Sequence, residues 1–341
     1  MAYIDLLQQN VTLAADAATT YNFSDTLPPS QDGSPHMTHL GIQLDGAFSD
    51  TMVANSPLSG LITQLKIQVG STVICDFYEP ITMGTLDGVS QLGILAQTLG
   101  GEDYVITDAE STTSFLAGFS LPVGLDASKA HRINVTLGLG DVSNWAGVAF
   151  NATTPTLNLV TSYGVSTEAT IIAGRQDNDI AGSASRTVTI MGRAGWNMLG
   201  IMACGPNYDA DDFTHYKVNN GQFRDLSVMQ WRAIAGRFNR SPLARMPAGT
   251  GASSSSGVVA AGPTYQAFQT GACFLNLFRI SAGSDLQLQI TNGNASSRTS
   301  SIFPVYVAPI GQNAGGRPRQ TIANKDSPTK TVLNEAQNSN V

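Results

Sequence analysis

The sequence predicts an all-β chain made of two similar antiparallel sandwiches, one after the other. Apolar and polar residues alternate over many short segments, which Gly, Pro, Asn and Ser separate. A helical stripe interrupts these segments once in each half of the chain. With 341 residues in total, each half is long enough to bury a core of its own.

The first half is expected to contain about eight short strands. Residues 3–7 are read as one short amphipathic turn of helix before an extended segment. The sequence PPSQDGSP forms a loop, Gly70-Ser71 turns a hairpin, and residues 138–147 form another loop. The expected strands are residues 11–23, 40–44, 62–69, 72–78, 104–107, 115–123, 133–137 and 157–161.

A helix is expected over residues 88–99. Asp87 precedes it and Gly100-Gly101 follow it, as the capping of a helix requires. Its apolar face consists of Val89, Leu92, Leu95 and Leu99. The same spacing recurs in the second half at Val228, Trp231, Ile234 and Phe238. The sequence therefore predicts one helix at the same place in each half.

The second half repeats the plan with longer loops. An acidic loop spans residues 207–212, and a Pro/Gly/Ser-rich insertion lies between residues 241 and 266. Residues after Gly311 are polar and are expected to form an arm or tail. The expected strands are residues 169–173, 187–191, 198–203, 213–218, 272–281, 286–290 and 302–308. The residues expected in the exposed loop are Thr250, Gly251, Ser253, Ser254, Ser255 and Ser256.

Short matching segments indicate an internal repeat. INVTLG at 133–138 matches LQITNG at 288–293, and Leu65-Lys66-Ile67 matches Tyr216-Lys217-Val218. In each half we also expect two paired strands near the end, namely 286–290 with 302–307 and 133–137 with 157–161. The constant order of the matches favours one plan used twice.

Eight short strands with one helix, repeated, indicate two consecutive eight-stranded antiparallel jelly-roll barrels. A pair of immunoglobulin-like sandwiches is the alternative, but it does not explain the repeated helix. The expected domains are an N-terminal arm over 1–10, a first jelly roll over 11–162, a second over 163–310, and a C-terminal arm or tail over 311–341.

On this pattern, together with FSLPVGL at 119–125 before HRINVTLG, the chain resembles the double jelly-roll major capsid proteins of adenovirus and of tailless, membrane-containing icosahedral phages. The resemblance spans residues 10–310. It implies a homotrimeric capsomer of pseudo-sixfold outline that tiles a virion shell after synthesis and assembly in the host cytoplasm. Implied partners are the chain itself, neighbouring capsomers, minor capsid, vertex or spike proteins, and an inner membrane, without sequence-specific nucleic acid.

No catalytic motif is present, since HExxH, GxSxG, P-loop and CxxC patterns are all missing. We expect no enzyme activity and no cofactor. His36 and His39 are favoured as residues of a solvated loop over a metal site. The weak candidate ligands for Ca²⁺ are Asp209, Asp211 and Asp212, with Asn207 beside them, and a second acidic loop is read at Asp177, Asn178 and Asp179.

Composition also limits the class of protein to which the chain can belong. Cys75, Cys204 and Cys273 lie in apolar stretches and are expected to be reduced and buried. The N-terminus lacks the features of a secretory signal, and no apolar run is long enough to cross a bilayer, so we expect a cytoplasmic folding site. Only 13% of residues are charged, which favours a surface covered by partners.

Two functions remain open. The first is a structural protein of an icosahedral shell. The second is a carbohydrate- or receptor-binding double sandwich, such as a phage adhesin or a lectin, and a β-sandwich hydrolase is weaker still. Trp145, Trp196 and Trp231 are the residues that could stack on sugars, although packing is the preferred role. Low aromatic content, 7%, favours the structural protein.

The two halves differ in charge. Residues 1–162 hold fifteen Asp and Glu against three Lys and Arg, whereas residues 163–310 hold eight against eleven. A head-to-tail ring would bring these opposite charges together. The alternative is that the acidic residues face solvent. The candidate interface residues are Arg175, Arg186, Arg193, Arg224, Arg232, Arg237 and Arg240.

Overall fold

The computed structural model describes most of the two halves but not the long insertion or the tail. For residues 3–12 and 272–279 it describes the backbone alone. The described ranges are 3–12, 18–50, 56–78, 91–106, 115–151, 155–204, 213–225 and 272–310. The second helical stripe, the Ca²⁺ candidates Asp209, Asp211 and Asp212, the loop residues 250–256 and the tail lie outside these ranges.

We call the strands from β1 to β11 the first unit. Its elements are β1 (Tyr3–Thr12), β2 (Thr19–Leu27), β3 (His36–Gly46), β4 (Ser56–Pro57), the 3-10 helix η1 (Leu58–Leu61), β5 (Ile62–Val69), β6 (Thr72–Tyr78), α1 (Gln91–Thr98), β7 (Glu102–Asp103), β8 (Val105–Ile106), β9 (Phe115–Asp126), β10 (His131–Leu139), α2 (Val142–Ala146) and β11 (Thr156–Gly164).

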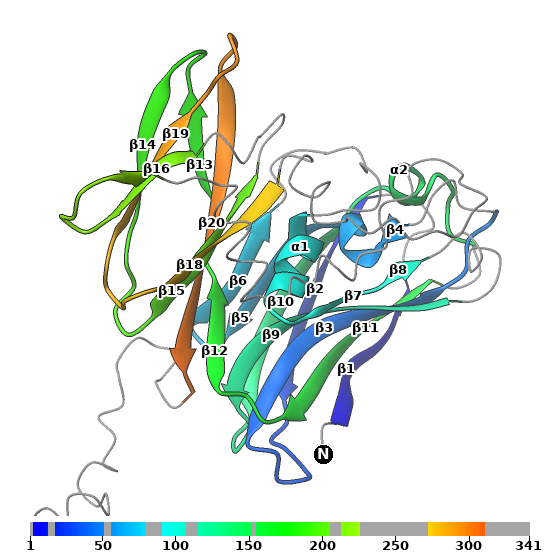
Figure 1. Ribbon diagram of the computed structural model, residues 1–341. Coiled ribbons are helices and arrows are strands. Elements are labelled where there is room, and N and C mark those ends of the chain that lie inside the picture. Colours follow the sequence, from blue (N-terminus) through cyan, green and yellow to red (C-terminus); the bar gives the residue numbers. More distant parts are fainter. Residues whose placement is uncertain are drawn as a thin grey trace, which may run out of the picture.

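We call the strands from β12 to β20 the second unit. Its elements are β12 (Glu168–Ile172), β13 (Gln176–Ile180), β14 (Ser185–Ile190), β15 (Asn197–Cys204), β16 (Phe213–Val218), β17 (Arg224–Asp225), β18 (Ala272–Ile280), β19 (Leu286–Thr291) and β20 (Arg298–Pro309). The two units lie side by side, and β20 runs along most of the height of the second (Figure 1).

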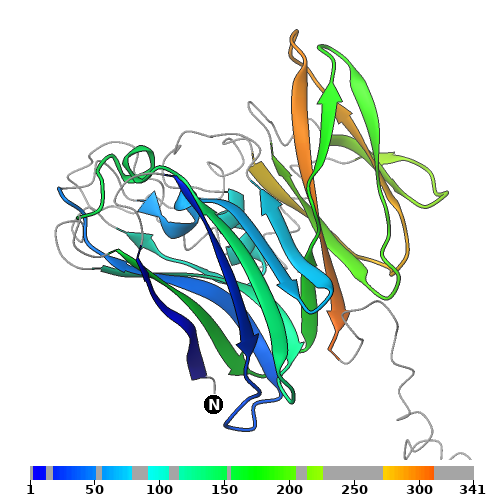
Figure 2. The ribbon, with the colours of Figure 1, turned by 180° about the vertical axis from the view of Figure 1, so that it is seen from behind.

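Three large sheets build the two units, and β4 pairs with β8 in a small two-stranded sheet. The outer sheet has the order β1-β11-β3-β9-β7, and the distal sheet has the order β14-β19-β16-β17. Between them, the shared sheet runs β18-β15-β20-β12-β6-β5-β10-β2, with β13 paired to β20. Its first four strands belong to the second unit and its last four to the first. Seen from behind, the shared sheet continues from one unit into the other (Figure 2).

The strand order of a jelly roll occurs twice. Leaving out the short β4, β7 and β8, and treating β12 with β13 as one interrupted strand, each unit has eight strands. In each unit, strands one, eight, three and six form one sheet, and strands two, seven, four and five form the other. The matching segments of the sequence occupy equivalent strands, because β10 and β19 are both seventh and β5 and β16 are both fourth.

The two expected pairs of strands were wrong. β19 pairs with β14 and β16 in the distal sheet, whereas β20 lies in the shared sheet. β10 and β11 are likewise in different sheets. Alternation of apolar and polar residues marks the buried face of a strand but does not identify its neighbour. The connection after the seventh strand therefore crosses between sheets in both units.

Two smaller expectations at the N-terminus were also wrong. Residues 3–7 are not a helical turn, and the segment 3–10 is not an arm, because β1 pairs with β11 from Tyr3 opposite Tyr163 to Thr12 opposite Thr156. Tertiary pairing overrides the weak local helical pattern there. The loop expected over 138–147 contains α2, which Asp141 caps by accepting a hydrogen bond from the Asn144 backbone N–H.

The hairpin at Gly70-Ser71 and the first helix are confirmed. Gly70 has a φ of 58°, which favours glycine, and Val69 pairs with Thr72 across the turn. The part of the expected helix that the structure describes is α1, which ends before Gly100. Its Leu92 and Leu95 are buried, as the stripe predicted.

The buried side chains form two clusters. The larger fills the first unit, between the outer sheet and the β6-β5-β10-β2 part of the shared sheet. The smaller fills the second unit, around Trp196 and Phe213. Cys75 is buried as expected, and burial raises the pKa of its thiol to about 12. No helix in the described ranges has the length and apolar character needed to span a membrane.

Candidate functional site

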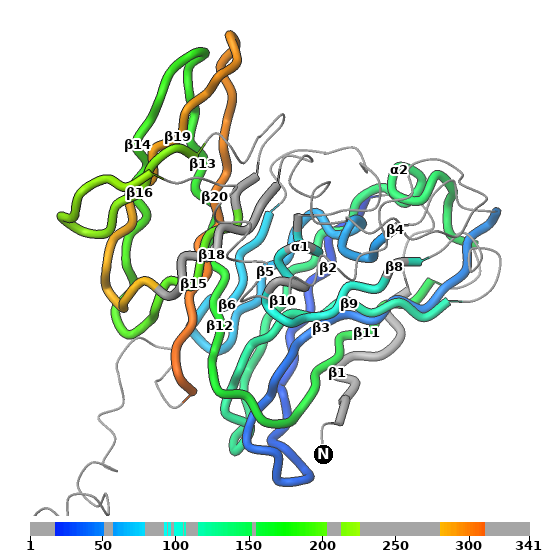
Figure 3. Tube along the Cα trace, viewed as in Figure 1, coloured from blue at the N-terminus to red at the C-terminus, as the bar shows by residue number. Residues whose placement is uncertain are grey.

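The two units join along one strand pair of the shared sheet. β6, the fifth strand of the first unit, runs parallel to β12, the first strand of the second, with Ile172 opposite Cys75. Phe77 of β6 stacks on Phe303 of β20, with ring centroids 4.8 Å apart. Figure 3 traces these strands as neighbouring tubes at the centre of the molecule.

Strands β12, β15 and β20 of the shared sheet have one face packed on the core of the second unit. Their opposite face is also apolar. Four of its side chains belong to the core cluster of the first unit: Ile172, Met202, Phe303 and Val305. α1 of the first unit also lies against β18. The first unit thus covers this face of the second, and we call the whole contact the junction.

Arg175 follows β12 and lies at the junction. Its guanidinium carbon is 5.1 Å from the ring centroid of Tyr78 in β6, and its Nη2 is 2.7 Å from Asp177 Oδ2. The side chain is 26% exposed, and its Nη1 is buried without a hydrogen-bond partner in the described part of the chain. This candidate for an interface between chains therefore connects two units of the same chain.

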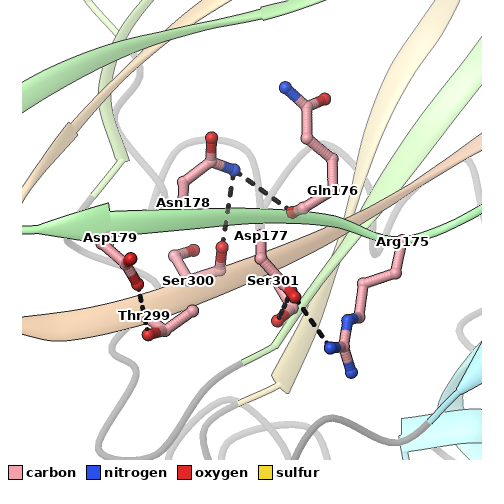
Figure 4. Close-up of polar contacts among 8 residues, drawn as sticks. All are labelled: Arg175, Gln176, Asp177, Asn178, Asp179, Thr299, Ser300 and Ser301. Carbon is pink, nitrogen blue, oxygen red and sulfur yellow. Dashed lines mark hydrogen bonds and ion pairs between the residues drawn. The ribbon is translucent and has the colours of Figure 1, made fainter.

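Polar residues of β13 and β20 lie next to Arg175 (Figure 4). Ser301 Oγ donates to Asp177 Oδ1 over 2.6 Å, and Thr299 Oγ1 donates to Asp179 Oδ1 over 2.6 Å. Asn178 is buried on the opposite face of β13, where its Nδ2 donates to the Gln176 carbonyl over 3.2 Å. The acidic loop expected here is therefore wrong, because the segment is a strand.

This arrangement does not favour a cation site on β13. Strand alternation separates Asn178 from Asp177 and Asp179, so the three side chains do not converge. Hydroxyl groups already occupy one oxygen of each carboxylate. Across the described ranges, no three His, Cys, Asp or Glu residues gather as metal ligands.

The other candidate arginines are scattered, and the structure describes three of them. Arg186 is exposed and donates from Nη1 to the Asp179 carbonyl over 2.7 Å. Arg193 lies over the indole of Trp196, 5.7 Å from the ring centroid. Arg224 is exposed on β17. Arg232, Arg237 and Arg240 lie outside the described ranges.

The edge of the distal sheet carries an exposed cluster on β16 and β17. Lys217 Nζ lies 4.8 Å from the ring centroid of Phe223, which is 43% exposed. His215 Nε2 is 3.0 Å from Asp225 Oδ1. A second ion pair, Arg175–Asp177, lies at the junction, and neither of these two pairs involves Lys217 or Arg224.

The solvent face of the outer sheet carries a shallow groove. A groove of about 270 Å³ lies beside β7, over strands β3, β9 and β11. Its lining includes His39, Gly41, Glu102, Ser120, Val160 and Ser162. Glu102 and Asp45 are exposed, and Leu116 is 56% exposed.

His36 and His39 lie on β3 and not in a solvated loop as expected. His36 Nδ1 accepts a hydrogen bond from the Ser166 backbone N–H over 3.1 Å. His39 Nε2 donates to the Gly100 carbonyl over 3.2 Å, since a carbonyl can only accept. The two imidazole rings therefore hydrogen-bond to different backbone groups of the chain, the Ser166 N–H and the Gly100 carbonyl.

Two of the three tryptophans are core residues, as the packing role predicted. Trp145 and Trp196 are 4% and 2% exposed, and Trp145 Nε1 donates to the Pro57 carbonyl over 2.9 Å. Neither presents a ring to a sugar. Trp231 lies outside the described ranges.

Asp103 carries the strongest shift among the described carboxyl groups. Burial raises its pKa to about 7, although the Ser59 hydroxyl and backbone N–H both donate to it and oppose the shift. The two residues tie β7 to the 3-10 helix η1 and lie away from the groove lining. We assign them a structural role.

No family model matches the chain, and no curated protein matches it in sequence. Its fold is similar to that of the STIV major capsid protein, from Sulfolobus turreted icosahedral virus. That crystal structure matches with a TM-score of 0.53 at 12% identity, and the match covers 91% of this chain and 97% of that chain.

Two further structures are less similar. The major capsid protein P2 of bacteriophage PM2 matches with a TM-score of 0.44 at 11% identity, over 92% of this chain and 99% of that chain. PBCV-1 VP54 matches with a TM-score of 0.41 at 12% identity, over 91% and 95%. The STIV comparison alone confirms the expected all-β, double jelly-roll fold.

Proposed function

We propose that the chain is a structural protein, the major capsid protein of an icosahedral virion. The single observation that carries this proposal is the fold shared with the STIV major capsid protein over nearly the full length of both chains. A match over 91% of this chain extends across both units and is not limited to one sandwich. A shared sandwich would be a weaker argument, because sandwiches serve many functions.

The proposed domains are a first jelly roll over 11–162, extended to Tyr3 by β1, and a second over 163–310. In this proposal three chains form a capsomer of pseudo-sixfold outline, and capsomers then assemble into the virion capsid. Minor capsid, vertex or spike proteins and an inner membrane are further proposed partners. Assembly in the host cytoplasm is likewise proposed.

The proposed role requires no catalysis and no cofactor. The described carboxylates on β13 are held by hydroxyl groups, and the groove on the outer sheet has one exposed carboxylate, Glu102, at its rim. The carbohydrate-binding alternative is less well supported, because Trp145 and Trp196 are buried.

The C-terminal residues 311–341 are proposed to act as an arm that contacts a neighbour or an acidic lipid surface. They contain Arg317, Arg319, Lys325 and Lys330 against Asp326 and Glu335. A variant that ends at residue 311 tests this part. Unchanged assembly and unchanged binding to anionic vesicles would show that the tail is inert.

Light scattering on the purified chain tests the proposed function. The mass of one chain is 35.8 kDa, and we expect a species of three times that mass at micromolar concentration. Obligate interfaces of this kind commonly bury about 2,000 Å² or more, so the trimer should persist on dilution. A stable monomer under the same conditions would contradict the proposal.

A further inference from the structure

A short linker, residues 165–167, joins the two units at the lower end of the first (Figure 1). It follows β11, which ends at Gly164, and precedes β12, which begins at Glu168 and meets β6 at the junction. Val165 is exposed and Ser166 is half-buried. The contacts that fasten this linker to the first unit therefore help to fix the path of the chain from one unit into the other.

One hydrogen bond of the linker reaches a titratable side chain of the first unit. The backbone N–H of Ser166 donates over 3.1 Å to Nδ1 of His36, which lies at the start of β3. Because an N–H can only donate, Nδ1 must be the unprotonated nitrogen of the ring, and the hydrogen of the neutral ring lies on Nε2. This hydrogen bond therefore requires a neutral imidazole.

Two further hydrogen bonds of the linker have acceptors that do not titrate. Ser166 Oγ donates to the Glu168 carbonyl over 3.0 Å, and the Ile310 backbone N–H donates to the Thr167 carbonyl over 3.3 Å. Ile310 follows β20, so the second of these bonds ties the linker to the second unit. Of the three bonds, the one to His36 is the bond that joins the linker to the first unit.

We propose that His36 is an acid-sensitive latch, which fastens the linker to the first unit while its ring is neutral and releases the linker when the ring gains a proton. A protonated imidazole carries hydrogen on both nitrogens, so Nδ1 then faces the Ser166 N–H as one donor against another. Histidine side chains make this change between about pH 8 and about pH 5. The inference concerns a single chain and goes beyond the proposed function.

A comparison of the four histidines of the chain singles out His36. Each of the other three has a partner that can accept a hydrogen bond: the Thr38 hydroxyl for His39, the Asp126 carbonyl for His131 and the Asp225 carboxylate for His215. A proton added to any of these rings is compatible with its partner. A proton added to His36 removes its hydrogen bond to the linker.

The charges near His36 favour release over retention. The charged groups on the neighbouring elements are three carboxylates and two bases, namely Asp32, Asp126, Glu168, Lys129 and His131. Asp126 lies opposite His36 on β9. A positively charged ring is attracted to carboxylates and not to the Ser166 N–H, whose hydrogen carries a partial positive charge.

Hydrogen exchange of the purified full chain tests the latch. Exchange is followed by mass spectrometry on overlapping peptides that cover the linker, at about pH 8 and at about pH 5. Each rate is divided by that of an unstructured peptide of the same sequence at the same pH, which removes the intrinsic pH dependence of exchange. We expect the protection of the Ser166 amide to fall at least about fivefold at the lower pH, because its hydrogen bond is lost. Equal protection at the two pH values would overturn the inference.

Two variants separate the latch from other effects of acid. An asparagine side chain places an oxygen near the position of Nδ1 and does not titrate, so His36→Asn should keep the linker protected at both pH values. A phenylalanine ring has no acceptor, so His36→Phe should leave the linker poorly protected at both.

The matched control is His39→Asn on the same strand, which should retain the fall in protection. Circular dichroism on every variant identifies a loss of folding, and the comparison of His36→Asn with the unchanged chain decides the outcome even if His36→Phe does not fold. A fall in protection that persists in His36→Asn would show that another group controls the linker and that the latch is wrong.

Discussion

Phe77 and Phe303 stack face to face across the junction, with ring planes inclined by 27°. The first residue belongs to the fifth strand of the first unit and the second to the last strand of the second unit, and both are almost completely buried. The core of the first unit therefore continues onto a sheet of the second. We expect the two units to unfold together and not as independent domains.

Phe303→Ala tests that coupling. Removing a fully buried ring from a packed core costs about 3–5 kcal/mol of the free energy of unfolding, because the lost contacts leave a cavity. We expect a loss of this size in urea titrations followed by fluorescence and circular dichroism. Phe223→Ala is the matched control, and on an isolated chain its exposed ring should cost less than about 0.5 kcal/mol. Equal losses in the two variants would contradict the account of the junction.

The buried side chain of Asn292 stabilises the connection after β19 by hydrogen bonds to the backbone. The residue is fully buried, its Nδ2 donates to the carbonyls of Ile180, Ala181 and Ser296, and its Oδ1 accepts from the Asn294 backbone N–H. Asn292→Ala leaves these groups without partners and should cost at least about 2 kcal/mol of the free energy of unfolding.

The control for that variant is Asn294→Ala. Asn294 is exposed, and the hydrogen bonds of the turn use its backbone, so its side chain should contribute less than about 0.5 kcal/mol. Thermal unfolding of both variants at one pH provides the comparison. A neutral Asn292→Ala would show that the buried amide does not stabilise the turn.

The raised pKa of Asp103 leads to a prediction of how the free energy of unfolding depends on pH. Burial raises its pKa in the folded chain to about 7, against about 4 in the unfolded chain. Between these values the folded state holds one more proton, so this group makes the free energy of unfolding fall as the pH rises from about 4 to 7. Its contribution is fully present below pH 4. Asp103→Asn should remove this part of the slope, which urea titrations at several pH values measure.

Ser59→Ala provides the complementary test. The Ser59 hydroxyl donates to Asp103 over 2.5 Å and lowers the pKa of the carboxyl. Without it the pKa should rise further, and the pH window of falling stability should extend above 7. An Asp103→Asn variant with the same pH slope as the unchanged chain would disprove the assignment of the titrating group.

The Ser-rich insertion is predicted to be dispensable for folding. Residues 250–256 lie outside the described ranges and contain no apolar side chain larger than the methyl group of Ala252. Their deletion should leave the unfolding temperature and the trimer mass unchanged, because the entropy of loop closure depends weakly on length. Failure of the deletion variant to fold would show that the segment packs against the core.

Much of the fold was predictable because alternation along a strand reports burial directly. Leu286, Leu288 and Ile290 alternate in the sequence and are all fully buried. The partner of a strand was not predictable in this way, and β19 was wrongly paired with β20 for that reason. A continuous apolar run from Ile302 to Ala308 was the available signal, since it marks a strand that is buried on both faces.

The candidate site was less predictable than the fold. Whole-half charge sums pointed to arginines, yet Arg175 turns out to join the two units of one chain. Sequence position cannot distinguish a contact within the chain from one between chains, because both use exposed edges of the individual unit. Tyr78 and Phe77 were missed at the junction for the same reason.

Electron microscopy of the purified protein tests the central claim most directly. Class averages should show a particle of three chains with a six-lobed outline, in which the two units of each chain alternate around the ring. Single chains, or assemblies in which equivalent units touch one another across a two-fold axis, would contradict the account.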